Sequence, residues 1–386
     1  MTLSDIINQL GEDRERYFNA VSPPIIQTSN FCQPTVKRLR EALEHEFEIP
    51  IYTRGMNPTV NILRQKLAAL EGTEDALITS SGCAAISCAV IAQLQQGDHV
   101  VCVRKPYSWV NTLFNQFLSR FGVETTMIDG RDPEMFRHAM RPETRLFYLE
   151  SPNSLTFELQ DLAAVSAIAR EKNILTITDN SFNTPLHLRP VDYGIDLVVH
   201  TGTKYLSGHS DVVAGVVCGK KKMIRKIFET ELLTLGGVIS PHDAWLMIRG
   251  LRTLPIRLKQ SSNSAGRIIS FLSEHPKVER VLSPSLPSHE QFELAQRQMK
   301  GCSGLFSFLV KTGSPERIEE FCETLRRFLL AVSWGGYESL VFPAIAMTHP
   351  SNEGDDKLPW NLIRLYIGLE DPEDLIADLE QALKKL

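Results

Sequence analysis

Several short segments of this chain place reactive or anion-binding groups directly after β-rich stretches. Lys204 follows Thr201-Gly202-Thr203 and has apolar neighbours, a setting that lowers the pKa of an amine and lets it act as nucleophile or base. Asp179 supplies a carboxylate after another β-rich stretch. Ser80-Ser81-Gly82 precedes a helical stretch whose first N–H groups suit an anion such as phosphate. Together these groups could bind a phosphorylated cofactor and carry out amine chemistry.

Each of these features also has a purely structural interpretation. Ser80-Ser81-Gly82 could be an ordinary N-cap, Asp179 a turn residue, and Lys204 a surface cation. The predicted elements favour the chemical interpretation, because the residues that follow the strands of an open α/β sheet meet in one crevice. Tyr107 and Glu150 follow two further predicted strands and should lie in the same crevice.

The spacing of apolar residues predicts a mainly parallel sheet covered by helices between about residues 60 and 240. The expected strands are 76–79, 100–103, 125–128, 146–149, 174–178, 197–200 and 215–218. The expected helices are 60–70, 84–95, 108–121 and 162–171. A smaller α/β part should follow, with strands 304–310 and 362–367 and a helix at 371–384. We therefore divide the chain into an N-terminal arm (1–59), a large domain (60–245) and a C-terminal α/β domain (246–386).

The composition is that of a soluble globular protein. Of the 386 residues, 43% are hydrophobic and 23% charged, and the net charge of −5 gives no basic footprint for nucleic acid. The seven cysteines are odd in number and form no Cys-x-x-Cys pair, so we expect reduced thiols, no disulfide frame and no metal site. Neither a signal peptide nor a membrane-spanning run is expected, which predicts a cytoplasmic protein.

Residues 196–210 read DLVVHTGTKYLSGHS and resemble the cofactor-attachment signature of the Cys/Met-metabolism (trans-sulfuration) enzymes. These enzymes use pyridoxal 5′-phosphate (PLP). Supporting segments occur in the family's order at 52–59, 150–152, 178–180 and 362–365, so the resemblance covers nearly the whole chain. It implies the α/β fold of a fold-type I PLP-dependent transferase, with PLP as cofactor and an amino acid as substrate.

The resemblance also implies a role for each matching residue. Lys204 would hold PLP as a Schiff base and move the Cα proton of the substrate, and Asp179 would pair with the ring nitrogen. Tyr107 would stack on the ring and assist proton transfer. The remaining cofactor contacts would come from Gly82, Cys83, Thr201 and Thr203, and from Tyr52 and Arg54 of a neighbouring subunit.

On the substrate side, Arg364 would clamp the α-carboxylate, where a bidentate guanidinium fits. The other residues expected in the substrate site are Ser333, Val332, Glu150 and Ser154. Because Tyr52 and Arg54 would serve a neighbouring subunit, the resemblance further implies a homo-oligomer, namely a tetramer built from active dimers.

Members of this family catalyse different reactions, so the reaction expected here depends on which branch the sequence resembles. Segments 150–154, 304–308, 333–340 and 367–371 resemble bacterial cystathionine β-lyases, whereas 52–59 is closer to the γ-synthases and γ-lyases. Val332 stands where cystathionine γ-enzymes tend to have glutamate and methionine γ-lyases often have valine. Trp109, two residues after Tyr107, either packs a helix or narrows the pocket.

We therefore expect a PLP-dependent C–S lyase that acts on cystathionine or a related sulfur amino acid by α,β-elimination. Three alternatives stay open. One is γ-replacement, as in cystathionine γ-synthase or an O-acyl-homoserine sulfhydrylase, and another is γ-elimination, as in methionine or cystathionine γ-lyase. A fold-type I aminotransferase is the alternative from a different class.

Overall fold

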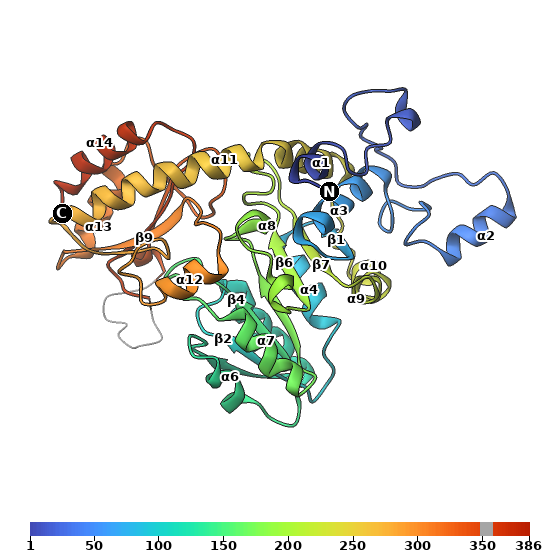
Figure 1. The fold of residues 1–386 in the computed structure, drawn as a ribbon, viewed down its shortest axis with the longest axis horizontal. Coiled ribbons are helices and arrows are strands. Elements are labelled where there is room, and N and C mark those ends of the chain that lie inside the picture. The colour runs from blue at the N-terminus through green and yellow to red at the C-terminus, as the bar shows by residue number, and fades with distance from the viewer. Residues whose placement is uncertain (348–357) are drawn as a thin grey trace.

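The computed structural model describes residues 1–347 and 358–386. In this part of the chain the strands form two sheets, one of seven strands in the order β1-β7-β6-β5-β4-β2-β3 and one of five in the order β10-β11-β12-β9-β8. The 34-residue helix α11 (Pro241–Glu274) runs from one sheet to the other (Figure 1). It packs against α3 beside the large sheet and against α14, β8 and β9 of the small one.

All seven strands predicted for the large sheet are present. They are β1 (Asp75–Thr79), β2 (His99–Val103), β3 (Glu124–Ile128), β4 (Thr144–Glu150), β5 (Leu175–Asp179), β6 (Leu197–Thr201) and β7 (Gly215–Gly219). The pairs β2·β3, β2·β4, β4·β5 and β5·β6 are parallel, and β7 is antiparallel to both β6 and β1. The sheet is therefore mainly parallel, as predicted. Most of its strands are buried on both faces, which explains their short, continuous apolar runs.

Helices cover both faces of this sheet. Side chains of α3 (Pro58–Glu71) and α7 (Leu162–Glu171) belong to the hydrophobic cluster on one face, and those of α4 (Gly82–Ile91) to the cluster on the other. The predicted helix 108–121 is divided into α5 (Ser108–Thr112), a π-helical turn (Leu113–Phe117) and a 3₁₀ turn (Leu118–Phe121). The shorter helices are α6 (Glu134–Ala139), α8 (Thr184–His187), α9 (Lys221–Ile227) and α10 (Leu233–Leu235).

The small sheet contains both predicted C-terminal strands, β9 (Leu305–Val310) and β12 (Leu362–Tyr366). The predicted C-terminal helix is α14 (Pro372–Leu383). The elements that were not predicted are β8 (Val278–Leu282), β10 (Leu329–Leu330), β11 (Leu340–Pro343), α12 (Phe292–Gln298) and α13 (Pro315–Thr324). The boundary proposed at 245/246 falls within α11, and the three-part division of the chain stays a prediction.

The N-terminal segment leaves the body of the molecule after its first helix. Helix α1 (Leu3–Asn8) packs against α3 and α11, and the fully buried Lys66 donates to the carbonyl oxygens of Ile6 (3.1 Å) and Ile7 (3.2 Å). The following residues project away from the sheets, with α2 (Val36–Glu44) at the far end (Figure 1). Among the described residues, no helix is long and apolar enough to cross a membrane.

Candidate active site

The predicted crevice lies at the carboxyl edge of the large sheet. Glu150 and Asp179 end the adjacent parallel strands β4 and β5 and are paired in register. Strand β6 ends at Thr201, three residues before Lys204, and the loop after β1 leads into α4. Since β7 is antiparallel to both β1 and β6, these two strands run in the same direction and end at the same edge. The fold thus brings the amine, both carboxyl groups and the start of α4 together.

Lys204 is held by a residue of the C-terminal part. Its Nζ donates to Ser333 Oγ at 2.5 Å and lies 5.4 Å from the ring centroid of Trp334. Burial lowers the pKa of the Lys204 amine to about 8, the nearby charge of Arg364 adds to this effect, and Asp179 opposes it. A larger share of the amine is therefore unprotonated near neutral pH, as a nucleophile or a base requires.

The two carboxyl groups are buried. Asp179 Oδ1 accepts a hydrogen bond from the Ser181 N–H at 2.8 Å, and Glu150 Oε2 accepts one from the Tyr107 N–H at 2.7 Å. Burial raises the pKa of Asp179, against the effects of Ser181, His200 and Lys204. Burial and the neighbouring Asp179 raise the pKa of Glu150 to about 8.

The start of α4 is shaped by close packing against the end of β6. Ser81 Oγ accepts from the Ala84 N–H at 3.1 Å, while the first N–H groups of a helix, here those of Gly82 and Cys83, have no partner within the helix. A Cβ at Gly82 would lie 2.3 Å from Thr201 Oγ1, so only glycine lets the two segments approach this closely. The backbone N–H groups of this helix start form a cradle that suits a phosphate.

Tyr107 lies beside this helix start. It precedes α5, its side chain is 41% exposed, and its hydroxyl is 4.0 Å from Cys83 Sγ. Burial, followed by the effect of Cys83, raises the pKa of the Tyr107 phenol to about 12. The phenol therefore stays protonated at neutral pH and acts as a hydrogen-bond donor.

Arg364 faces the site from β12 of the small sheet. Its guanidinium donates to the carbonyl oxygens of Ser154 (3.4 Å) and Ser333 (3.3 Å), and no carboxylate of the described residues forms an ion pair with it. Burial lowers the pKa of Arg364 to about 10, so the group is still charged at neutral pH. The Arg364 guanidinium carbon also lies 5.1 Å from the Phe342 ring centroid. A buried cation without a carboxylate partner among the described residues is suited to an incoming carboxylate.

Comparison with known proteins assigns this arrangement to a family. The family described as Cys/Met metabolism PLP-dependent enzyme matches residues 5–384. The chain belongs to this family. It is 39% identical over 376 residues to the L-methionine gamma-lyase of Treponema denticola, with 96% of this chain and 94% of the relative covered. It is 38% identical over 372 residues to the cystathionine gamma-lyase of Bacillus subtilis, with 95% of each covered.

The fold agrees with this assignment. The crystal structure of metB from Corynebacterium glutamicum superposes with a TM-score of 0.93 at 34% identity, covering 100% of this chain and 98% of that one. The expected fold-type I PLP-dependent fold is thus confirmed, and the chain is a PLP-dependent trans-sulfuration enzyme, a lyase or a γ-synthase.

The residues of the site fit the cofactor of this family. Lys204 would offer an amine of lowered pKa to the PLP aldehyde, and Asp179 would offer a buried carboxylate to the ring nitrogen. The helix start at Gly82 offers N–H groups to the phosphate. Thr203 fits less directly, because its hydroxyl accepts from the Ala214 N–H (3.0 Å) and donates to the Ala214 carbonyl (3.3 Å). Its contact with the phosphate stays a prediction.

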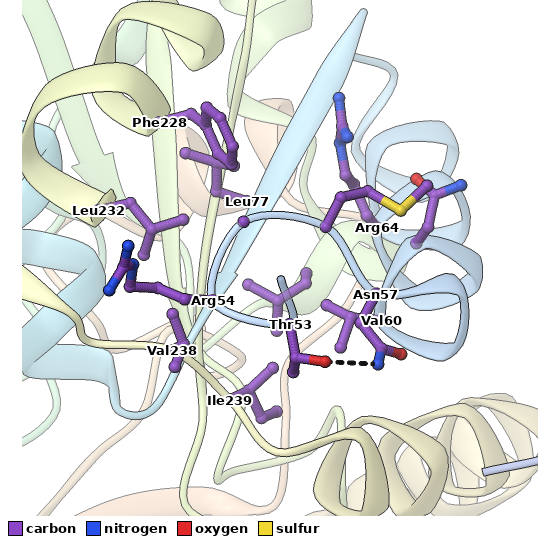
Figure 2. Close-up of a pocket in the computed structure, with 14 residues that line it drawn as sticks. Thr53, Arg54, Asn57, Val60, Arg64, Leu77, Phe228, Leu232, Val238 and Ile239 are labelled. Atoms are coloured by element: carbon purple, nitrogen blue, oxygen red, sulfur yellow. Dashed lines mark hydrogen bonds between the residues drawn. The ribbon is translucent and has the colours of Figure 1, made fainter. Parts of the chain in front are cut away.

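Four of the residues singled out in the sequence form no hydrogen bond, ion pair or ring contact with Lys204 in the described part of the chain. Tyr52 is 45% exposed, and the Arg54 guanidinium carbon lies 5.5 Å from its ring centroid. Arg54 lines a small cavity, near Leu232 and Val238 (Figure 2). Neither residue forms a hydrogen bond or an ion pair with a Lys204-site residue among those described. Val332 and Trp109 are 69% and 59% exposed, and their roles likewise stay predictions.

Two contributors to the site were missed by sequence reasoning. Ser181 donates its N–H to Asp179 and accepts from the Thr201 N–H at 2.6 Å, so it connects the acid to the end of β6. Its position just after Asp179 was the available signal. The second contributor is the buried pair His200 Nε2–Glu71 Oε2, 2.8 Å apart, behind the site. Nothing in the local sequence relates two residues that are 129 positions apart.

Proposed function

We propose that this enzyme is a carbon–sulfur lyase that releases a thiol from a sulfur-containing amino acid. The observation that carries the proposal is the position of Ser333 between two functional groups. Its hydroxyl accepts from the Lys204 amine, and its carbonyl accepts from the Arg364 guanidinium. A substrate whose α-carboxylate binds Arg364 would therefore present its Cα beside the amine that must take the proton.

Each residue of the site has a defined task in this proposal. PLP, when bound, supplies the electron sink that makes removal of the Cα proton possible. Lys204 accepts that proton, and a pKa of about 8 suits a base that works near neutral pH. Arg364 fixes the carboxylate, and the protonated phenol of Tyr107 donates a hydrogen bond or a proton at the cofactor. Asp179 holds a negative charge toward the ring nitrogen.

The relatives and Val332 both bear on whether the sulfur leaves from Cβ or from Cγ of the substrate. Relatives named L-methionine gamma-lyase cover almost the whole chain, which supports elimination at Cγ. Valine at position 332 offers no charge and no hydrogen bond, so an apolar thioether end suits this position better than a distal amino group. The second candidate is α,β-elimination from cystathionine, which the likeness of segments 150–154 and 333–340 to β-lyases supports.

We further propose that the enzyme is a cytoplasmic homotetramer built from active dimers. The arm supports this assembly, because much of it projects from the sheets (Figure 1). In addition, Tyr52 and Arg54 are exposed and form no hydrogen bond or ion pair with the residues of the Lys204 site among those described, which leaves them free to serve a neighbouring subunit. All seven cysteines are free thiols, which supports a reducing compartment.

A product assay tests the reaction. The PLP-loaded enzyme is given methionine or cystathionine, and 2-oxobutyrate, pyruvate and free thiol are measured. Elimination at Cγ of methionine gives 2-oxobutyrate with methanethiol, whereas α,β-elimination of cystathionine gives pyruvate with homocysteine. Lys204→Ala is the control and should form neither keto acid. A keto acid without thiol, formed only with an amino acceptor, would show an aminotransferase instead. A new thioether from an O-acyl-homoserine and cysteine would show γ-replacement.

A further inference from the structure

Glu150 and Asp179 form a pair of buried carboxyl groups. They lie opposite each other at the ends of β4 and β5, and their residues are 6% and 8% exposed. Side chains at paired positions of parallel strands point to the same face of a sheet. Two ionised carboxylates in such a position would repel each other strongly in a medium that screens charge poorly. A single proton held by the pair removes most of this repulsion.

The surroundings of the two acids differ. The Ser181 N–H donates to Asp179 at 2.8 Å, and Lys204 and His200 lower its pKa, so all three favour its ionised form. Glu150 accepts from the Tyr107 N–H at 2.7 Å, and hydrogen bonds from the backbone of Tyr107 and Ser154 lower its pKa, but no cation does so and it forms no ion pair among the described residues. The proton of the pair is therefore better placed on Glu150.

Among the described residues, the titratable groups that interact with Glu150 supply no positive charge. The titratable side chains that act on it or are influenced by it are Asp179 on β5, Tyr148 on β4, Cys102 on β2 and Tyr107 before α5. Cys83 of α4 acts on both tyrosines. None of these is a cation, and burial raises the pKa of Tyr148 and Cys102 well above the ordinary values.

We propose that Glu150 is a positioning residue that remains protonated while Asp179 is ionised. A single negative charge then faces the cofactor ring, and the Glu150 side chain fixes the backbone of Tyr107 through the hydrogen bond to its N–H. Glu150 would thus act through Asp179 and Tyr107 and not on the substrate. This inference rests on the cofactor contacts proposed above for those two residues.

Infrared spectroscopy of the PLP-loaded enzyme tests where the proton lies. A protonated carboxyl group has a carbonyl-stretching band that an ionised carboxylate lacks. We expect such a band in the wild type at neutral pH, shifted when the protein is made with ¹³C-carboxyl glutamate and unshifted with ¹³C-carboxyl aspartate. This labelling requires no substitution, so the result does not depend on how a variant folds.

Two variants assign the band to a residue. Glu150→Gln should remove it. In Asp179→Asn the neighbouring charge is absent and burial alone favours the protonated form of Glu150, so the band should weaken, and what remains of it should still shift with the glutamate label. Glu319→Gln, an isosteric change at an exposed residue of α13, is the matched control and should leave the band unchanged. A band lost in Asp179→Asn and kept in Glu150→Gln would overturn the assignment of the proton. A wild type without any such band would overturn the proposal as well, because both acids would then be ionised.

Cofactor affinity tests the positioning role separately. Glutamine is neutral and still offers an acceptor to the Tyr107 N–H, so the Kd for PLP in Glu150→Gln should stay within about threefold of the wild type. Glu150→Ala removes the acceptor and should weaken binding by about tenfold. Equal affinities of these two variants would contradict the role of the hydrogen bond. An enzyme with these spectra and affinities that forms no keto acid would contradict the lyase function and leave this inference intact.

Discussion

Ser333 Oγ accepts a hydrogen bond from Lys204 Nζ across the boundary between the two sheets, at 2.5 Å. Ser333 has a φ of 81°, a left-handed conformation that costs about 1–2 kcal/mol for a residue with a Cβ. In this conformation the Ser333 hydroxyl contacts Lys204 and the Ser333 carbonyl contacts Arg364. Ser333 therefore connects the amine proposed to act in catalysis with the guanidinium proposed to bind the substrate.

Removing the Ser333 hydroxyl should slow catalysis with little effect on substrate affinity. A net hydrogen bond contributes about 0.5–1.5 kcal/mol, so we expect kcat of Ser333→Ala to fall by about two- to tenfold. KM should change little, because the carbonyl that holds Arg364 is part of the backbone. Steady-state kinetics with the substrate found in the product assay measures both constants.

Ser333→Gly is the matched control for backbone strain. Glycine also lacks the hydroxyl but adopts φ values near 81° without a steric penalty. It should therefore lose kcat to the same extent as alanine while unfolding at an equal or higher denaturant concentration. A glycine variant with wild-type kcat would show that the hydroxyl has no role.

The pH dependence of cofactor incorporation should report the pKa of Lys204. Only the unprotonated amine can bond to the PLP aldehyde, and the Lys204 pKa is about 8. The rate at which the cofactor-free protein gains its absorbance with PLP should therefore rise with pH, with a midpoint near 8. A midpoint close to that of a free lysine would contradict the buried position of the amine.

Arg364→Gln tests whether the charge of Arg364 lowers the pKa of Lys204. The positive charge of Arg364 favours the neutral form of Lys204, so its removal should raise the Lys204 pKa and move the profile to higher pH. Arg249→Gln, at an exposed position of α11, is the control and should leave the midpoint unchanged.

The place of the candidate site could be predicted, because its ionisable groups follow directly after buried strands. The apolar runs before Asp179 and Lys204 are short and bounded by polar turn residues, and β5 and β6 lie where the sequence placed them. Because β5 and β6 are parallel, Asp179 and Lys204 were expected to lie at the same edge of the sheet. The 129-residue separation between Lys204 and Ser333 was bridged by the family resemblance alone, since no local pattern predicts a contact across two sheets.

Other elements could not be predicted because tertiary packing overrides the local pattern. Pro255 would ordinarily end or bend a helix, yet α11 continues through it. Leu251, Leu254 and Leu258 around it are buried, and this packing offsets the missing backbone hydrogen bond. The two-residue strand β10 lies within the apolar run 328–332, yet its own side chains are exposed. A strand this short has no periodicity that the sequence could reveal, so its pairing with β11 was not predicted.

Gly82→Ala should weaken PLP binding and destabilise the protein. The new Cβ would lie 2.3 Å from Thr201 Oγ1 and 3.0 Å from two other atoms of that side chain, so α4 or β6 must shift. Overpacking of this kind typically costs about 1–3 kcal/mol, which urea unfolding can measure. The shift also displaces the N–H groups expected to bind phosphate, so the Kd for PLP should rise by about tenfold or more.

Two further variants identify the cause of this effect. In Gly82→Ala combined with Thr201→Gly, the clash is absent, so the cost of Gly82→Ala in that background should be much smaller. Gly266→Ala in α11 is the matched control, because no atom lies within 4 Å of its new Cβ. Alanine is a better helix former than glycine, and this variant should be neutral or stabilised by up to about 1 kcal/mol.

Val332→Glu should change the choice between substrates. Val332 is 69% exposed and directly precedes Ser333, so its side chain can meet the distal end of a substrate bound at Arg364. A glutamate would attract the distal amino group of cystathionine and offer nothing to the methyl thioether of methionine. Charge pairs at exposed positions contribute about 0.2–1 kcal/mol, so kcat/KM for cystathionine relative to methionine should rise by about two- to fivefold.

Val332→Gln separates charge from size in this test. Glutamine has nearly the shape of glutamate without its charge, and should give much less of the change. The effect of glutamate should also shrink as salt is added, because exposed charges are screened. An equal effect of the two variants, or one that salt does not alter, would show that position 332 acts through shape. If neither variant changes kcat/KM for cystathionine relative to methionine, the distal end of the substrate does not reach Val332. Other residues of the site would then determine the substrate specificity of the enzyme.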